Sequence, residues 1–114
     1  MTTPKITLEK DPSRWRISAM GIVLGESRNV LRLSEGTYAP VLYLPKSDLN
    51  MINFTMTNKS THCPYKGDAS YYSVSSGTKT LENIGWCYEH PLDSVAEIKN
   101  HIAFYTDQIN IEKQ

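Results

Sequence analysis

The sequence predicts a mainly β single domain that ends in one amphipathic helix. Most of the chain alternates between apolar and polar residues with a period of two, which is typical of half-buried strands. Near the C-terminus the period changes to three and four residues, which indicates a helix. The length of 114 residues suits one domain. We expect it to cover residues 1–114, with a core at about residues 5–110 and loose, polar ends at residues 1–4 and 111–114.

The composition limits the classes of partner. Hydrophobic residues make up 39% of the chain and charged residues 21%, and the formal net charge is +0. Nucleic acid and anionic membranes are therefore not expected as partners, because both require clustered Lys and Arg. No apolar run approaches the length of a membrane span, and the first residues lack the apolar core of a signal peptide. We expect a cytoplasmic protein whose two cysteines are free thiols.

Four strands are expected in the first part of the chain. The stretch "RWRISA" places Trp15, Ile17 and Ala19 on one face, with arginine and serine on the other. Gly21 then permits a turn into the next strand, and Pro45 ends the apolar stretch "VLYLP". The four expected strands are residues 14–19, 22–27, 30–33 and 41–45.

The middle of the chain predicts three more strands. In "ASYYSV", Tyr71 and Tyr72 point to opposite faces of a strand, so we expect at least one of them to face a cleft or an interface. The expected segments are strand 49–56, polar turn 57–60, strand 69–74, hairpin loop 75–79 and strand 80–88.

The expected C-terminal helix begins after Pro91, and Ser94 and Glu97 have the spacing of a capping box. An amphipathic helix that follows several strands is expected to lie on one sheet or along its edge. Its apolar stripe is formed by Val95, Ile98, Ile102, Tyr105 and Ile109.

Three blocks of sequence carry a resemblance to a known family. They read "CPYKGDASYY", "ENIGWCYEHPL" and "IKNHIAFY", and "GES" and "VLYLPKSDL" precede them in order. On these blocks the chain resembles the domain-of-unknown-function 427 family, which also carries a nucleotidyltransferase-like label. Cys87 departs from the family pattern, which usually has another small or aromatic residue there. The resemblance implies a β-tent of two sheets leaning together, close to a sandwich, and it implies no established function.

The segment "THCPYKGDASYYSV", residues 61–74, is the candidate site because it combines a thiol, an ammonium, a carboxylate and three phenol rings. Aromatic rings commonly line small-ligand pockets, and the Lys66 ammonium suits a carboxylate or phosphate. We predict that a bend after Pro64 turns Cys63 and Lys66 toward one hollow, which binds a small polar or anionic metabolite. The predicted ligand-binding residues are Tyr65, Lys66, Asp68, Tyr71, Glu82 and Trp86.

Two alternatives remain open at this point. In the first, the domain is an enzyme whose catalytic residues are Cys63 and Lys66, because a nearby ammonium lowers the pKa of a thiol and makes it nucleophilic. In the second, the motif only specifies the fold, and an exposed strand edge or the helix forms a homodimer without any ligand.

No metal or other cofactor is expected. Structural zinc requires four good ligands, and Lys66 occupies the place of a second ligand after the first cysteine. Nucleotidyl transfer requires closely spaced carboxylates that hold a divalent cation, and no such pair follows the "GES" stretch. The residues considered for zinc are His62, Cys63, Cys87 and His90.

Overall fold

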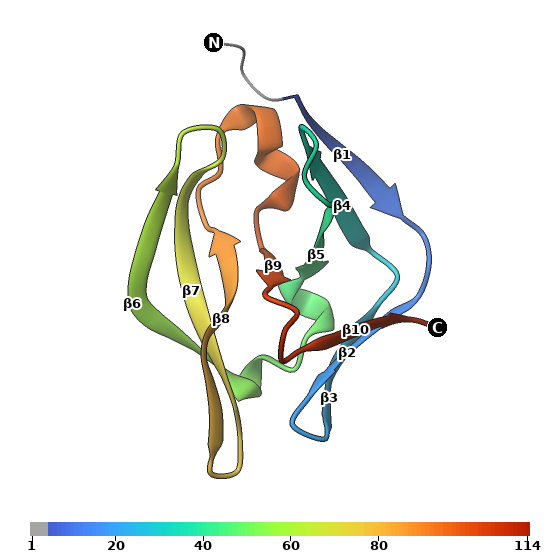
Figure 1. Ribbon diagram of the computed structural model, residues 1–114, viewed down its shortest axis with the longest axis vertical. Helices are drawn as coiled ribbons and strands as arrows, with labels where there is room; N and C mark the ends of the chain where they lie inside the picture. Colours follow the sequence, from blue (N-terminus) through green and yellow to red (C-terminus); the bar gives the residue numbers. More distant parts are fainter. Residues whose placement is uncertain (1–4) are drawn as a thin grey trace.

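The computed structural model describes residues 5–114, which form ten strands and three short 3-10 helices (Figure 1). No helix in this part of the chain has the length and hydrophobicity needed to span a membrane. The 3-10 helices are η1 (Lys46–Asp48), η2 (Met51–Asn53) and η3 (Asp93–Ile98). The strands are β1 (Ile6–Asp11), β2 (Trp15–Ala19), β3 (Ile22–Ser27), β4 (Val30–Glu35), β5 (Val41–Pro45), β6 (Phe54–Cys63), β7 (Gly67–Ser76), β8 (Lys79–Tyr88), β9 (His101–Phe104) and β10 (Asn110–Lys113).

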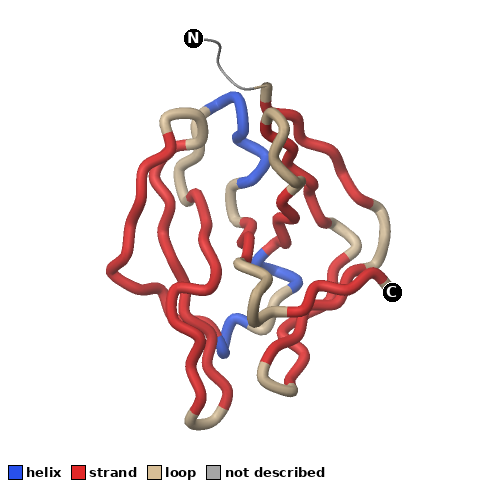
Figure 2. The backbone as a smooth tube through the Cα atoms, in the orientation of Figure 1, coloured by secondary structure: helices blue, strands red, loops and turns tan. Residues whose placement is uncertain are grey.

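The strands form two open antiparallel sheets (Figure 2). The larger sheet has seven strands in the order β1-β4-β5-β9-β8-β7-β6, and the smaller has three in the order β10-β2-β3. Short β9 joins the two halves of the larger sheet, because it pairs with β5 on one side and with β8 on the other. In Figure 1 the β6–β8 half and the β1–β4–β5 half stand on either side of η3.

Hydrophobic residues are buried on both faces of the larger sheet. The first cluster lies between the two sheets and includes Ile17, Leu24 and Ile102. The second cluster lies on the opposite face, where Val95 and Ile98 of η3 cover the sheet. Consecutive residues of one strand belong to different clusters, which is the alternation that a strand with two buried faces requires. Such consecutive pairs are Tyr43 with Leu44, Tyr71 with Tyr72, and Cys87 with Tyr88.

Most of the expected strands are confirmed, with changes at their ends. Strand 49–56 is replaced by η2 followed by the start of β6, and residues 57–60 lie within β6 where its pairing with β7 shifts register. The hairpin between β7 and β8 turns at Gly77 and Thr78. Strand β1 was not anticipated, and residues 111–113 pair with β2 where a loose end was expected.

The prediction of a C-terminal amphipathic helix is wrong. Only the short 3-10 helix η3 forms; Val95 within it has a non-helical φ of −128°, and Asn100 has a left-handed φ of 64°. The chain then extends as β9 because its backbone completes the larger sheet between β5 and β8. The apolar spacing is real, but Ile98 packs on one face of the sheet and Ile102 on the other. Tertiary pairing therefore overrides the local pattern.

Candidate functional site

A cavity of about 440 Å³ lies on the face of the larger sheet that carries the second cluster. Its volume falls within the range of roughly 300–1,000 Å³ that is usual for small-molecule sites. Both halves of the larger sheet contribute to its lining. The lining residues are Leu33, Glu35, Tyr38, Ala39, Val41, Tyr43, Lys66, Tyr71, Trp86 and Tyr88.

Aromatic side chains form the walls of this cavity. Tyr71 on β7 lies directly opposite Trp86 on β8, so the two side chains share one face of the sheet. Tyr43 faces them from β5, and the indole Nε1 of Trp86 donates a hydrogen bond of 3.4 Å to its hydroxyl. This bond joins the two halves of the sheet across the cavity. Behind Trp86, the ring of Tyr105 packs at a centroid distance of 4.7 Å.

The polar end of the cavity is an ion pair between Lys66 and Glu35. The Lys66 Nζ donates to Glu35 Oε1 at 2.6 Å, and the two side chains are 11% and 21% exposed. Glu35 ends β4, whereas Lys66 lies in the turn between β6 and β7. The pair therefore also connects the two halves of the sheet, at a distance of 31 residues along the chain.

The turn that contains Lys66 is fixed by its backbone. The Lys66 N–H donates to the Cys63 carbonyl at 3.2 Å, and the Lys66 carbonyl accepts from the Leu92 N–H at 3.0 Å. Gly67 has a φ of +114°, which residues with a side chain rarely adopt. A Cβ on Gly67 would also lie 3.2 Å from the His90 carbonyl oxygen. The "CPYKG" turn is therefore a specific backbone conformation that directs Lys66 inward.

The electrostatics of the cavity keep Lys66 charged and the phenols of Tyr43 and Tyr88 neutral. Burial lowers the pKa of Lys66, but its hydrogen bond to Glu35 and the neighbouring negative charges outweigh this, so the pKa lies above 10.5. Burial raises the pKa of Tyr43 and of Tyr88 well above 10.0. At neutral pH the cavity thus offers the Lys66 ammonium and the neutral hydroxyl groups of Tyr43 and Tyr88.

The structure brings three of the predicted site residues together, since Lys66, Tyr71 and Trp86 line the same cavity. Cys63 and Tyr65 are half-buried beside it and are not among the lining residues, and Cys63 packs against the second cluster. The other two predicted residues lie elsewhere.

Asp68 and Glu82 are both exposed and both lie outside the cavity. The Asp68 carboxylate pairs with His62 Nδ1 at 2.7 Å on the β6–β7 hairpin. Glu82 borders a separate shallow depression with Lys59 and Asn83. Neither carboxylate is therefore placed to contact a molecule held against Lys66.

Sequence reasoning did not identify Glu35 and Tyr43 as site residues. Glu35 is part of the stretch "SEGTYAP", which reads as an ordinary turn. Tyr43 is the only aromatic residue in the otherwise aliphatic "VLYLP" strand, and its hydroxyl needs a partner when it is buried. That unusual tyrosine was the one available signal.

The residues considered for zinc are not assembled. Cys63 packs against the cluster on one face of the larger sheet, and Cys87 belongs to the cluster on the other face. Within residues 5–114, no group of three or more His, Cys, Asp or Glu side chains is arranged to hold a metal ion. Cys87 instead neighbours Glu89, whose carboxylate binds Lys46 Nζ at 3.0 and 3.1 Å.

The two thiols are expected to differ in reactivity. Cys87 is fully buried, and burial raises its pKa to about 11. On the order of one Cys87 thiol in a thousand is then ionised at pH 8, and even that fraction is shielded from reagent. Iodoacetamide at pH 8 should therefore modify Cys63 alone in the folded protein and both cysteines in 6 M guanidinium chloride. Peptide mapping by mass spectrometry checks this; equal modification of both thiols in the folded protein would contradict the buried placement of Cys87.

Two comparisons with known proteins gave different results. A search among curated proteins finds no match for this chain. The family model described as a domain of unknown function (DUF427) matches residues 7–114, which include every strand that lines the cavity. The chain therefore belongs to the domain-of-unknown-function 427 family.

Proposed function

We propose that this domain binds a small, flat, polar molecule in the cavity that Lys66, Glu35 and the aromatic residues line. The observation that carries the proposal is the convergence of the Lys66–Glu35 pair and five aromatic side chains on one cavity of about 440 Å³. A tent-like arrangement of the two halves of the sheet would supply the opposing walls. The two free cysteines fit a reducing compartment such as the cytoplasm.

The ion pair narrows the chemistry of the ligand. The Lys66 ammonium has three N–H donors and uses one on Glu35, whose second oxygen remains an acceptor. The pair can therefore bind a ligand that presents an acceptor beside a donor, as an amide edge or an amino-carboxylate does. A simple anion is less suitable because the Glu35 carboxylate repels it and already neutralises Lys66. Flat apolar parts of the ligand would lie against the tyrosine and tryptophan rings.

Binding is proposed here without a chemical step. A nucleophilic lysine must lose its proton, and the raised pKa of Lys66 keeps it as an ammonium at neutral pH. A nucleophilic cysteine must reach the bound molecule, and Cys63 is not among the residues that line the cavity. The enzyme alternative thus lacks a nucleophile in contact with the proposed ligand.

A thermal-shift screen of amides, amino acids and small heterocycles tests this proposal, with Ala39→Trp as a variant that fills the cavity. Ala39 lines the cavity from an exposed loop, so a larger side chain there blocks the space without disturbing the core. A ligand at ten times its Kd should stabilise the wild type by about 1.4 kcal/mol and raise its Tm by about 4–6 °C.

The control is Ala96→Trp, because Ala96 is also exposed but lies in η3 outside the cavity lining. We expect ligands that raise the Tm of the wild type to raise that of Ala96→Trp equally and to leave Ala39→Trp unchanged. The proposal fails if no compound raises the Tm, or if the compounds that do so act equally on Ala39→Trp.

A further inference from the structure

A second cavity, of about 430 Å³, shares no lining residue with the first. The end of β1, the β3–β4 turn, η3 and the start of β9 form it. It combines two cationic side chains, an amide and an imidazole with a small apolar surface. The lining residues are Lys10, Asp11, Pro12, Arg28, Asn29, Leu31, Glu97 and His101.

The Asp11 carboxylate in this cavity is already neutralised. Its Oδ1 accepts a hydrogen bond from the Ser13 N–H at 2.9 Å, and its Oδ2 accepts from Arg32 Nη2 at 2.9 Å. The backbone hydrogen bond from Ser13 and that from Arg32 hold the pKa of Asp11 far below its ordinary value. Asp11 and Arg32 therefore cancel each other's charge and leave the remaining charges of the cavity to act on a ligand.

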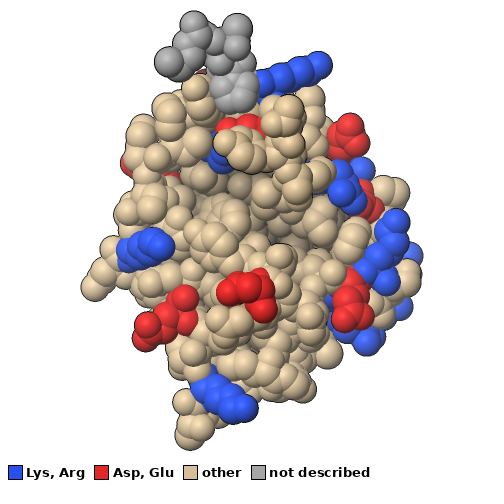
Figure 3. All heavy atoms as spheres, in the orientation of Figure 1, with Lys and Arg blue, Asp and Glu red and all other residues tan. Residues whose placement is uncertain are grey.

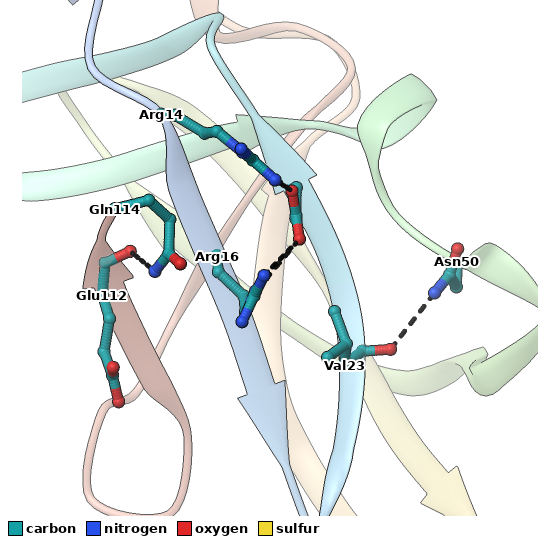
Figure 4. A network of polar contacts seen from close by, with 7 residues as sticks. Arg14, Arg16, Val23, Asn50, Glu112 and Gln114 are labelled. Carbon is teal, nitrogen blue, oxygen red and sulfur yellow. Dashed lines mark hydrogen bonds and ion pairs between the residues drawn. The ribbon is translucent and has the colours of Figure 1, made fainter.

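Among the residues that the structure describes, Arg14 and Arg16 are each paired with a carboxylate, whereas Arg28 is not. Arg14 Nε donates to Glu26 at 2.9 Å and Arg16 Nε donates to the same carboxylate at 3.0 Å (Figure 4). Within residues 5–114, the guanidinium of Arg28 and the ammonium of Lys10 have no hydrogen bond or ion pair with an acidic side chain. Figure 3 shows Lys and Arg, with Asp and Glu among them, along the side of the molecule where β1, β2 and β10 lie.

An amide and an imidazole complete the polar lining of this cavity. Among residues 5–114, the Asn29 side-chain amide makes one hydrogen bond, of 3.5 Å to Asp48, so one of its N–H groups is available. His101 Nδ1 lies 2.8 Å from the Lys99 carbonyl, which can only accept, so Nδ1 carries the proton. In this tautomer the Nε2 atom is an acceptor for a ligand hydroxyl.

We propose that this cavity binds a phosphate monoester of a small hydroxylated molecule. A phosphate dianion offers three terminal oxygens and two charges, which match the donors of Arg28, Lys10 and Asn29 better than a planar, singly charged carboxylate does. His101 Nε2 accepts from a hydroxyl of the organic part, and Leu31 contacts its carbon atoms. Glu97 at the same cavity repels the phosphate and weakens its binding.

Glycerol 3-phosphate is the probe, titrated into the full chain at low salt and followed by amide chemical shifts. We expect shifts at residues 10, 28, 29 and 101, and a Kd about tenfold weaker in Arg28→Gln. Glu97→Gln should bind about two- to threefold more tightly, because it removes a repulsive charge. Lys79→Gln is the control, since Lys79 is an exposed cation in the β7–β8 hairpin.

Three outcomes would overturn the proposal. Arg28→Gln could weaken binding no more than Lys79→Gln does, Glu97→Gln could fail to tighten it, or inorganic phosphate could bind as tightly as glycerol 3-phosphate, which would indicate an adventitious ion only. The Tm of each variant shows that it remains folded. Ala39→Trp should leave this binding unchanged, so the result is independent of the proposed ligand at Lys66.

Discussion

Replacing Gly25 with alanine is expected to lower the free energy of unfolding by about 3 kcal/mol. Gly25 is buried in β3 and forms an isolated bridge with Leu49, beside η1. A Cβ at this position would overlap the Asp48 carbonyl oxygen and lie 3.0 Å from the Leu49 Cα. Both are backbone atoms, so no side chain can rotate away and the strand itself must move.

The consequence reaches both sheets, because this contact joins β3 of the smaller sheet to the segment that follows β5 of the larger one. The Asn50 N–H donates to the Leu24 carbonyl at 2.8 Å in the same place. A displaced β3 would therefore also loosen Leu24, which is fully buried between the sheets. Loss of this junction should leave each sheet with an exposed apolar face.

Gly77→Ala is the matched control for Gly25→Ala. Gly77 has a φ of +61° in the β7–β8 hairpin, and a Cβ there would meet no atom within 4 Å. Alanine at Gly77 should therefore cost only about 1 kcal/mol of backbone strain. Urea unfolding of both variants provides the measurement. A cost for Gly25→Ala that is no larger than that for Gly77→Ala would show that β3 and the η1 segment do not approach closely.

The strands could be predicted because each apolar alternation records burial of that strand alone. The two tyrosines of "ASYYSV" show where this reasoning is incomplete. The prediction that at least one of them faces a cleft holds for Tyr71, which lines the cavity, but Tyr71 and Tyr72 are also each only 6% exposed, because the larger sheet is buried on both faces. The local sequence of one strand cannot indicate how many of its faces other elements cover.

The C-terminal region illustrates the same limit in another form. The positions of Val95, Ile98 and Ile102 fit a helical stripe, but they are buried because they contact two different faces of one sheet. Residues 101–104 form a strand because β5 and β8 each have an edge to pair with, and only the arrangement of the whole sheet would indicate this. The left-handed Asn100 was a weak local signal, since asparagine adopts that conformation more readily than most residues.

Part of the candidate site was predictable because it lies in one contiguous turn. Gly67 and Pro64 indicated a bend, and the bend does bring Lys66 into a cavity with Tyr71 and Trp86. Glu35 was missed because it comes from the other half of the sheet, and only the fold places it 2.6 Å from Lys66. The partner of a buried charge is thus the feature that sequence reasoning is least able to supply.

Disrupting the Lys66–Glu35 ion pair is expected to have the second large effect on stability. Lys66→Met and Glu35→Met should each lower the free energy of unfolding by about 2–3 kcal/mol, because each leaves a largely buried charge without its partner. The double variant replaces both charges with apolar side chains of similar length. Its cost should fall below the sum of the single costs by about 1–2 kcal/mol. Urea unfolding measures all three, and strictly additive costs would mean that the two side chains do not interact.

The Lys46–Glu89 ion pair is a control that separates the structural role of the Lys66–Glu35 pair from its proposed role in binding. Lys46 and Glu89 form a similar ion pair, 22% and 28% exposed, with Tyr72 rather than the cavity as its neighbour. The double variant that combines Lys46→Met and Glu89→Met should therefore also be less stable than the wild type. It should still bind any ligand found in the thermal-shift screen. The Lys66 and Glu35 double variant should lose that ligand even at temperatures where it is fully folded. Retention of the ligand there would place it somewhere other than the polar end of the cavity.

The pH dependence of stability provides an independent test of the Lys66–Glu35 ion pair, because it depends on the direction in which the Lys66 pKa is shifted. Because the pKa of Lys66 is raised above 10.5 in the folded state, the stabilisation from its charge is complete at neutral pH. It is lost as the pH rises through the folded-state pKa, where the ammonium gives up its proton. The difference in stability between wild type and the double variant should thus stay constant from pH 7 to pH 9 and shrink above about pH 10.5. A difference that instead grows in alkaline solution would mean that burial, rather than Glu35, dominates the pKa of Lys66.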